Sequence, residues 1–389
     1  MKTLEQLLTV GRYAGLGLVL ACTANTGDKN NINDSGSESC VAWEQTFSRN
    51  DGNDYINSVQ QTTDGGYVLA GFTNSSGSSG DGLLVKTDEN GNKKWEQTFS
   101  RNDYNDFIYS VQQTIDGGYV LAGHTEFPYG EGMDDGWLVK TDTDGNKQWE
   151  QTFGFGGYSG DFIYSVQQTT DGGYVLAGDT ENDGWLVKTD SDGNKQWEQT
   201  FGEREEDLIY SVQQTVDGGY VLAGDTQSSG AGRNDAWLIK TDTDGNKQWE
   251  QTFGGSENDS ISSFQQTING GYVLVGYTNS DNTNTDGWLV KTDADGNKQW
   301  EQTFGSNHLS SVVQASDGGY VLAGSTNSDG LLIKTDKNGN KQWEQTFGGS
   351  EDDLLSSLQQ TTDGGYILAG YTTTSSYEVY GLLLKACDK

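Results

Sequence analysis

The residues with the clearest capacity for chemistry are aspartates that recur at one position in a repeated sequence. Each precedes a short apolar run, and Asn307 takes this position in one copy. They are Asp54, Asp106, Asp161, Asp207, Asp259 and Asp353. If the copies surround an axis, these carboxylates would meet at one opening and could hold a cation or a cationic ligand. The alternative is local, since an aspartate before a strand often accepts N–H groups of the turn.

A second acidic motif is the segment Asp142-x-Asp144-Gly145-Asn146. Alternating oxygen ligands before a glycine are typical of calcium loops, so Asp142, Asp144 and Asn146 are a candidate Ca²⁺ site. Two other copies lack one of the carboxylates, and no distal glutamate follows. The alternative is a hairpin turn that needs Asp or Asn before glycine for its backbone angles. The pattern favours the turn, with calcium as the other possibility.

Conventional catalytic residues are few. The only histidines are His124 and His308, which lie in different copies without partner motifs, and we expect both on solvent-facing loops. No nucleophile elbow, phosphate loop or His/Cys metal spacing is present. The sequence therefore predicts a protein that is not an enzyme and has no cofactor, apart from the possible calcium.

Comparison of the copies shows where they differ. Two of the four connections in each copy hardly change, whereas the other two vary in length and chemistry. The variable connections carry aromatic residues at Phe127, Tyr129, Phe155, Tyr158, Tyr377 and Tyr380. Binding residues are usually displayed on loops of a rigid scaffold, and aromatic loops suit sugar or protein contacts. These residues and the aspartates form a candidate ligand-binding face, although drift of unconstrained loops would produce the same variation.

The element that must position these residues is a repeat marked by the string Gly-Gly-Tyr. The tyrosines are Tyr67, Tyr119, Tyr174, Tyr220, Tyr272, Tyr320 and Tyr366. A period of about 50 residues is typical of propellers and solenoids. Each copy contains four short runs rich in Val, Tyr, Trp, Thr and Phe, separated by turn residues. This pattern predicts four antiparallel strands, the blade of a β-propeller. A serine repeated in the first run, as at Ser58 and Ser110, is predicted to make structural hydrogen bonds.

The ends of the repetitive region predict a closed ring. Residues 43–47 form a fourth run without the three that should precede it, and residues 382–385 form a third run without a fourth. Together they complete one blade, which would remove the exposed strand edges of an open stack. The sequence thus predicts an all-β, seven-bladed propeller over residues 40–389, closed by the N-terminal strand.

Two cysteines flank this seam. Cys40 lies three residues before Trp43 and Cys387 two after Lys385. In the other blades the corresponding residues, such as Asn92 and Asp88, flank the hairpin turn and should be cross-strand neighbours. The spacing predicts a Cys40–Cys387 disulfide, which requires an oxidising compartment. Two separate thiols are the alternative.

The N-terminus predicts export. Residues 1–21 contain a short apolar run suited to a signal peptide, and Val19-Leu20-Ala21-Cys22 resembles the bacterial lipobox, whose cysteine is lipidated. Residues 22–39 have the composition of a flexible tether. We expect a protein anchored to the cell envelope by lipid on Cys22, at the outer membrane or cell surface. An ordinary secretory signal is the alternative.

The charge excludes one class of partner. The chain has 57 acidic and 23 basic residues, a formal net charge of −34. Such a field repels phosphate backbones, so no nucleic-acid partner is expected.

Two resemblances extend this interpretation. The stretch from Thr141 to Trp149, TDTDGNKQW, resembles the tryptophan-docking turn of quinoprotein propellers but is about one residue shorter, which implies the architecture and not the cofactor. The WxxTFGG and GGYVLAG repeats resemble those of uncharacterised bacterial and archaeal surface propellers. The whole resembles in kind the propeller lipoprotein of outer-membrane barrel assembly. We therefore expect a non-catalytic binding scaffold whose partner is an envelope protein or glycan; a glycan-acting enzyme or a Ca²⁺-dependent adhesin is the alternative.

Overall fold

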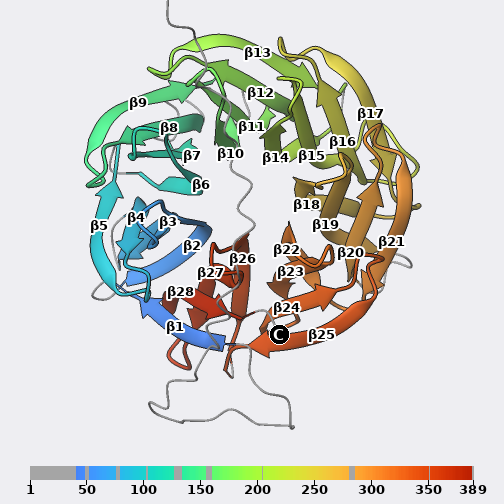
Figure 1. Ribbon diagram of the computed structural model, residues 1–389. Helices are drawn as coiled ribbons and strands as arrows, with labels where there is room; N and C mark the ends of the chain where they lie inside the picture. The colour runs from blue at the N-terminus through green and yellow to red at the C-terminus, as the bar shows by residue number, and fades with distance from the viewer. Residues whose placement is uncertain are drawn as a thin grey trace, which may run out of the picture.

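The computed structural model describes residues 41–48, 52–75, 79–101, 104–126, 134–154, 160–203, 205–279, 285–349 and 351–387. In these ranges the regular structure is entirely strand, arranged as seven four-stranded antiparallel sheets in a ring around a central axis (Figure 1). The predicted seven-bladed propeller is confirmed. Within the same ranges the chain forms no helix of the length and apolar character that crossing a bilayer requires.

The strands follow the blades in chain order. Blade one has β2 (Gly52–Gln61), β3 (Tyr67–Ser75), β4 (Asp81–Thr87) and β5 (Lys93–Phe99). Blade two has β6 (Asp106–Gln113), β7 (Tyr119–Thr125), β8 (Asp135–Thr141) and β9 (Lys147–Phe153). Blade three has β10 (Phe162–Gln168), β11 (Tyr174–Thr180), β12 (Asp183–Thr189) and β13 (Lys195–Phe201). Blade four has β14 (Asp207–Gln214), β15 (Tyr220–Thr226), β16 (Asp235–Thr241) and β17 (Lys247–Phe253). Blade five has β18 (Asp259–Gln266), β19 (Tyr272–Asn279), β20 (Thr285–Thr292) and β21 (Lys298–Phe304). Blade six has β22 (His308–Gln314), β23 (Tyr320–Ser325), β24 (Gly330–Thr335) and β25 (Lys341–Phe347). Blade seven has β26 (Asp353–Gln360), β27 (Tyr366–Thr373), β28 (Val379–Ala386) and β1 (Val41–Phe47).

The hydrophobic core lies between blades. Every residue of the second strand β7 is buried, because neighbouring blades cover both faces of the sheet. Val120 and Leu138 of blade two pack against Ile163 and Leu176 of blade three, and all four are fully buried. Similar clusters fill the other junctions, so each blade is stabilised mainly by its neighbours.

The N-terminal strand closes the ring as predicted. β1 pairs antiparallel with β28, with Trp43 opposite Lys385 and Val41 opposite Ala386 (Figure 1). Cys40 lies outside the described residues, so the Cys40–Cys387 disulfide stays a prediction.

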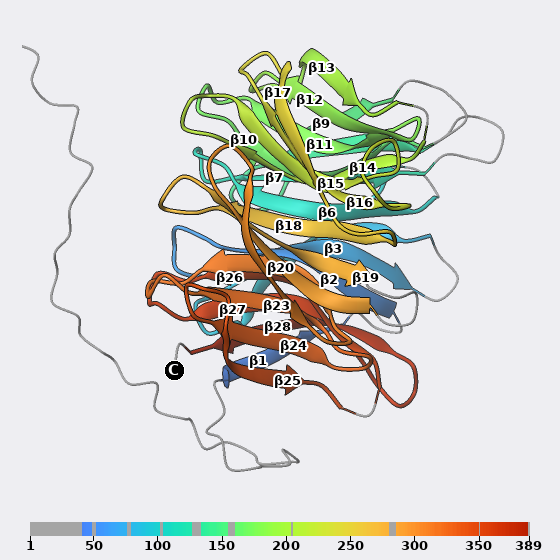
Figure 2. The same cartoon turned by 90° about the vertical axis from the view of Figure 1, so that its right-hand side faces the viewer.

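The propeller has two different faces. The connections after the first and third strands lie on one side, which we call the turn face, where Lys94 Nζ lies 3.2 Å from the Asp64 carboxylate. The connections after the second and fourth strands lie on the other side (Figure 2), which we call the variable face. There the N–H of Gly80 donates to Asn105 Oδ1 at 2.7 Å, which joins two such connections.

Candidate functional site in the channel and on the variable face

The six recurrent aspartates are buried, with exposures of 0–3%. Asp106 Oδ2 accepts the N–H of Arg101 at 2.8 Å, and Asp259 and Asp353 accept the N–H groups of Gly255 and Gly349 at 2.8 and 2.9 Å. A threonine hydroxyl of the next strand donates to several of them, as Thr226 does to Asp207. The carboxylates therefore cap the turns that enter the inner strands. The expectation of an accessible carboxylate ring needs correction, because these oxygens are directed into the protein.

The Asp-x-Asp-Gly-Asn motif forms the expected hairpin turn. Asp142 Oδ1 accepts the N–H groups of Asp144 and Asn146 at 2.9 and 2.8 Å, and Gly145 has the positive φ of 81° that the turn requires. Among the described residues, no three His, Cys, Asp or Glu side chains are arranged to hold a metal ion. The motif is accounted for by its backbone role.

The candidate aromatic loop residues are only partly described. Phe127, Tyr129, Phe155 and Tyr158 lie outside the described residues. Tyr377 is 79% exposed on the connection between β27 and β28, and Tyr380 donates its hydroxyl to Glu378 at 2.9 Å. Both lie on the variable face, where an incoming ligand could reach them.

The prediction for His124 is wrong. It lies in β7, 4% exposed, and its ring stacks on Phe107 with the centroids 4.7 Å apart. Burial lowers the pKa of His124 to about 4, so the ring is neutral at physiological pH. His308, at the start of β22, is exposed.

His124 packs against an aromatic wall formed by inner-strand residues of blades two to four. Tyr164 lies 5.3 Å from Tyr109 and 5.6 Å from Tyr210, measured between ring centroids. The equivalent residues in blades five to seven are the small Ser262, Ser310 and Ser356. The wall is therefore one-sided.

Two buried carboxylates, Asp179 and Asp225, lie next to tyrosines of this wall. Burial raises the pKa of Asp179 to about 7 and that of Asp225 to about 6. Asp225 accepts the Ser260 hydroxyl and the Asn234 amide, both at 3.0 Å. Asp179 Oδ1 has no hydrogen-bond donor among the described residues.

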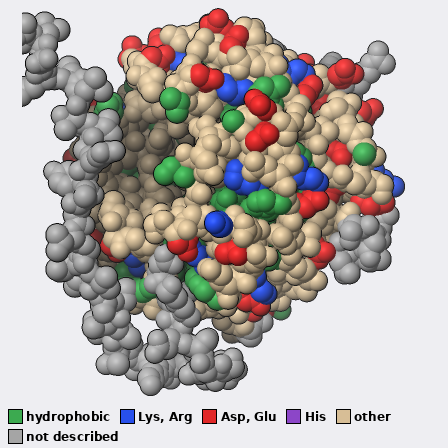
Figure 3. Space-filling view, turned by 45° about the vertical axis from the view of Figure 1, so that its right-hand side comes forward, with side chains coloured by type: hydrophobic (Ala, Val, Ile, Leu, Met, Phe, Trp, Pro, Cys, Tyr) green, Lys and Arg blue, Asp and Glu red, His purple; other side chains and the backbone are tan. Residues whose placement is uncertain are grey.

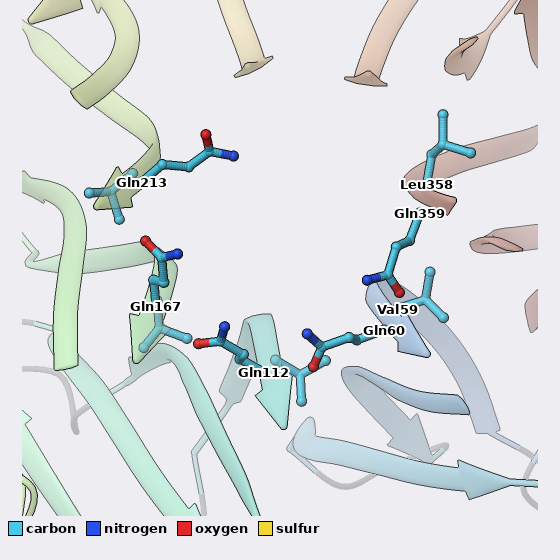
Figure 4. A pocket seen from close by; sticks show the side chains of 10 residues that line it. Val59, Gln60, Gln112, Gln167, Gln213, Leu358 and Gln359 are labelled. Atoms are coloured by element: carbon cyan, nitrogen blue, oxygen red, sulfur yellow. The ribbon is translucent and has the colours of Figure 1, made fainter. Parts of the chain in front are cut away.

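The deeper channel is lined by glutamines. In six of the seven blades a glutamine of the inner strand accepts, through Oε1, the N–H of a glutamine in the next blade, at 2.5 to 3.1 Å. These six residues, which we call the glutamine belt, are Gln60, Gln112, Gln167, Gln213, Gln265 and Gln359. Val313 takes the position in blade six. Five belt residues line a cavity of about 240 Å³ together with the aliphatic residues that precede them (Figure 4).

Sequence reasoning missed this belt, although its signal was visible as the repeated Gln-Gln pair. The recurrent serines were identified correctly, since Ser58 Oγ accepts the N–H of Val111 at 3.2 Å and Ser110 Oγ that of Val166 at 3.3 Å. On the side shown in Figure 3, acidic side chains are dispersed and the surface is hollowed where the channel opens.

Comparisons with known proteins give a family and a fold. Residues 134–357, or 224 of the 389, match the family described as outer membrane protein assembly factor BamB. No curated protein matches the sequence.

The similar solved structures are distant in sequence. Drosophila Plexin A in complex with Semaphorin 1b has 8% identity and a TM-score of 0.54, covering 90% of this chain and 87% of that chain. A protein of unknown function from Dyadobacter fermentans has 12% identity and a TM-score of 0.51, covering 91% and 100%. The Dos1 propeller has 14% identity and a TM-score of 0.51, covering 85% and 77%. At these identities the likeness shows the propeller fold alone.

Proposed function

The chain belongs to the family of the outer membrane protein assembly factor BamB, and we propose that it is a non-catalytic binding propeller of the cell envelope, anchored by lipid on Cys22. The observation that carries the proposal is the division of the repeat into fixed and variable parts. Residues identical in nearly every blade make structural contacts, whereas residues that differ are concentrated in the connections of one face.

The residues that recur in nearly every blade make structural contacts. On the turn face a buried lysine of the third strand pairs with an aspartate of the Asp-Gly-Gly turn in six blades, at 2.7 to 3.1 Å. The capping aspartates accept N–H groups of the turns, and the inner-strand serines accept N–H groups of the next blade. Such residues maintain a scaffold, and scaffolds of this kind present loops for binding.

The variable face differs from blade to blade. At blade two, the side-chain amide of Asn105 donates to the Glu126 carboxylate at 2.7 Å. At blade four, the backbone N–H of Glu203 donates instead to the Ser228 hydroxyl at 3.2 Å. A surface of this kind suits an asymmetric partner, an envelope protein or a glycan. A glycan-acting enzyme is less well supported, because the carboxylates that it would use are buried caps.

The test is a loop exchange. Replacing residues 126–134 and 154–160 with the shorter connections of blade six should preserve the melting temperature and abolish capture of the envelope partner. The matched control is Asp144→Ala on the turn face, which should leave capture intact. Capture that survives both exchanges and fails in the control would refute the assignment of the face.

A further inference from the structure

The glutamine belt satisfies backbone groups at the exposed edge of each inner strand. The inner strand of each blade pairs with only one strand, so its other edge presents N–H groups toward the channel. Side chains of the preceding blade satisfy these groups. In blade two, Ser58 Oγ receives the N–H of Val111 and Gln60 Oε1 receives that of Gln113.

This bonding fixes the orientation of each belt amide. In a glutamine side chain only Oε1 can accept a hydrogen bond, so Oε1 must face the N–H of the neighbouring strand. The amide nitrogen Nε2 is then left at the opposite end, and Figure 4 shows the Nε2 atoms of the five labelled glutamines directed into the channel. Gln213 Nε2 donates to the Phe264 carbonyl at 3.4 Å. Among the described residues, the other belt nitrogens have no protein acceptor.

The cavity between these amides limits what could bind there. Its lining contains no charged side chain. A cation would meet only N–H donors, and an anion would be held without a counter-charge in a chain of net charge −34. An apolar ligand would displace water from these half-buried donors and leave them unpaired. A neutral ligand with many oxygen acceptors satisfies the amides, and its C–H groups can contact the valines.

We infer that the channel at the glutamine belt is a binding site for an uncharged, hydroxyl-rich small molecule of the sugar or polyol class. The cavity of about 240 Å³ suits one sugar ring. Gln60, Gln112 and Gln167 donate to its oxygens, while Val111 and Val166 contact its carbon skeleton. This site is separate from the partner surface proposed on the variable face, and either can fail without the other.

Blade six supplies the design of the test. Val313 shows that the fold accommodates a belt position without an amide, so Gln→Val variants should fold. Gln112→Val and Gln167→Val remove donors that line the cavity. Gln265→Val is the matched control, because it removes the same kind of cross-blade bond, from Gln314 N–H, at a belt residue outside the cavity lining.

The experiment titrates the full exported chain with D-glucose and D-mannitol and follows the side-chain amide resonances of ¹⁵N-glutamine-labelled protein. We expect saturable shifts of the belt Nε2 signals, with the millimolar dissociation constant usual for so small a ligand. The Gln112→Val/Gln167→Val double variant should bind at least about tenfold more weakly, whereas Gln265→Val should bind as the parent does. Glucuronate and glucosamine should bind more weakly than glucose.

Three results would overturn the inference. They are the absence of saturable shifts with both neutral probes, equal weakening by the Gln265→Val control, and binding of a charged sugar as tight as that of glucose. Thermal unfolding of each variant confirms that the comparison is made between folded proteins.

Discussion

One blade lacks an ion pair that the other six contain, and restoring it is a test of how the turn face is stabilised. Lys291 in blade five is buried like its equivalents, but Asn269 stands where they meet an aspartate. Its ammonium donates to the Thr292 carbonyl at 2.6 Å, and burial lowers the pKa of Lys291. We predict that Asn269→Asp stabilises the protein.

The magnitude follows from the exposure of the two partners. In the other blades the lysine side chains are 3–8% exposed and the aspartates 47–64%. Because the carboxylate is half in water, its Coulomb attraction is strongly screened, and the gain should be about 1 kcal/mol. The reverse change, Asp217→Asn in blade four, leaves Lys240 buried beside a neutral amide and should cost about 1–3 kcal/mol.

The pH dependence gives an independent check. Burial alone would raise the pKa of Asp171, but hydrogen bonds from Thr169 and Lys188 outweigh it and lower the pKa to about 2. A carboxylate with a depressed pKa stabilises the fold above its unfolded pKa of about 4, and this contribution is lost as the pH falls through about 2. The gain from Asn269→Asp should therefore be present at pH 7 and disappear in strong acid.

The assay is urea unfolding at pH 7, with Asn338→Asp as the matched control. Asn338 is exposed in the turn between β24 and β25, so the control adds the same charge at a position that does not correspond to the lysine-paired aspartates. Stabilisation by Asn269→Asp and not by the control is expected. If the two variants behave alike, or if Asp217→Asn is neutral, the buried lysines do not depend on their aspartates.

Three further outcomes are expected. Because the folded pKa of Asp179 is raised to about 7, stability that this group contributes below about pH 4 is lost as the pH rises through 7. Asp179→Asn should thus flatten the decline of the melting temperature between about pH 4 and 7, and an unchanged decline would contradict the raised pKa. Changing Cys387 to Ser should cost roughly 2–4 kcal/mol under non-reducing conditions, and separate Cys40 and Cys387 fragments in a non-reducing peptide map would exclude the bridge. Cys22→Ser should release the protein from membranes or block its processing, and unchanged detergent partitioning would contradict lipid anchoring.

The closure of the ring could be predicted because it depends only on counting the strands of each type. The unmatched segments at 43–47 and 382–385 leave one arrangement that removes both edges, and the structure contains it as β1 paired with β28. The hairpin turns were equally predictable, because a glycine with positive φ, such as Gly145, is required by local geometry.

The functional roles were harder to predict, because identity between copies does not show whether a side chain faces solvent or a neighbouring blade. The repeated aspartates could be a mouth ring or buried caps, and only the packing of adjacent blades decides for Asp207 and Asp259. His124 was misplaced for the same reason. Its equivalents in other blades include Phe72 and Tyr277, an aromatic signal that could have indicated a packed position.

The orientation of the belt glutamines could not be predicted either. A Gln-Gln pair on a strand suggests a polar surface, whereas its Oε1 atoms bond to the next blade. That role follows from the inner strand being a sheet edge beside a channel, which the sequence of one copy does not reveal.

The central claim is that the variable face binds the envelope partner, and site-specific photo-crosslinking in the cell tests it most directly. A photoreactive residue replaces Tyr377, 79% exposed on the variable face, or Val216, 99% exposed at the tip of a turn-face hairpin. The two positions are similarly accessible, so they differ mainly in the face that they report. We predict a discrete crosslinked species from position 377 and none from position 216. Crosslinking from position 216 alone would contradict the account.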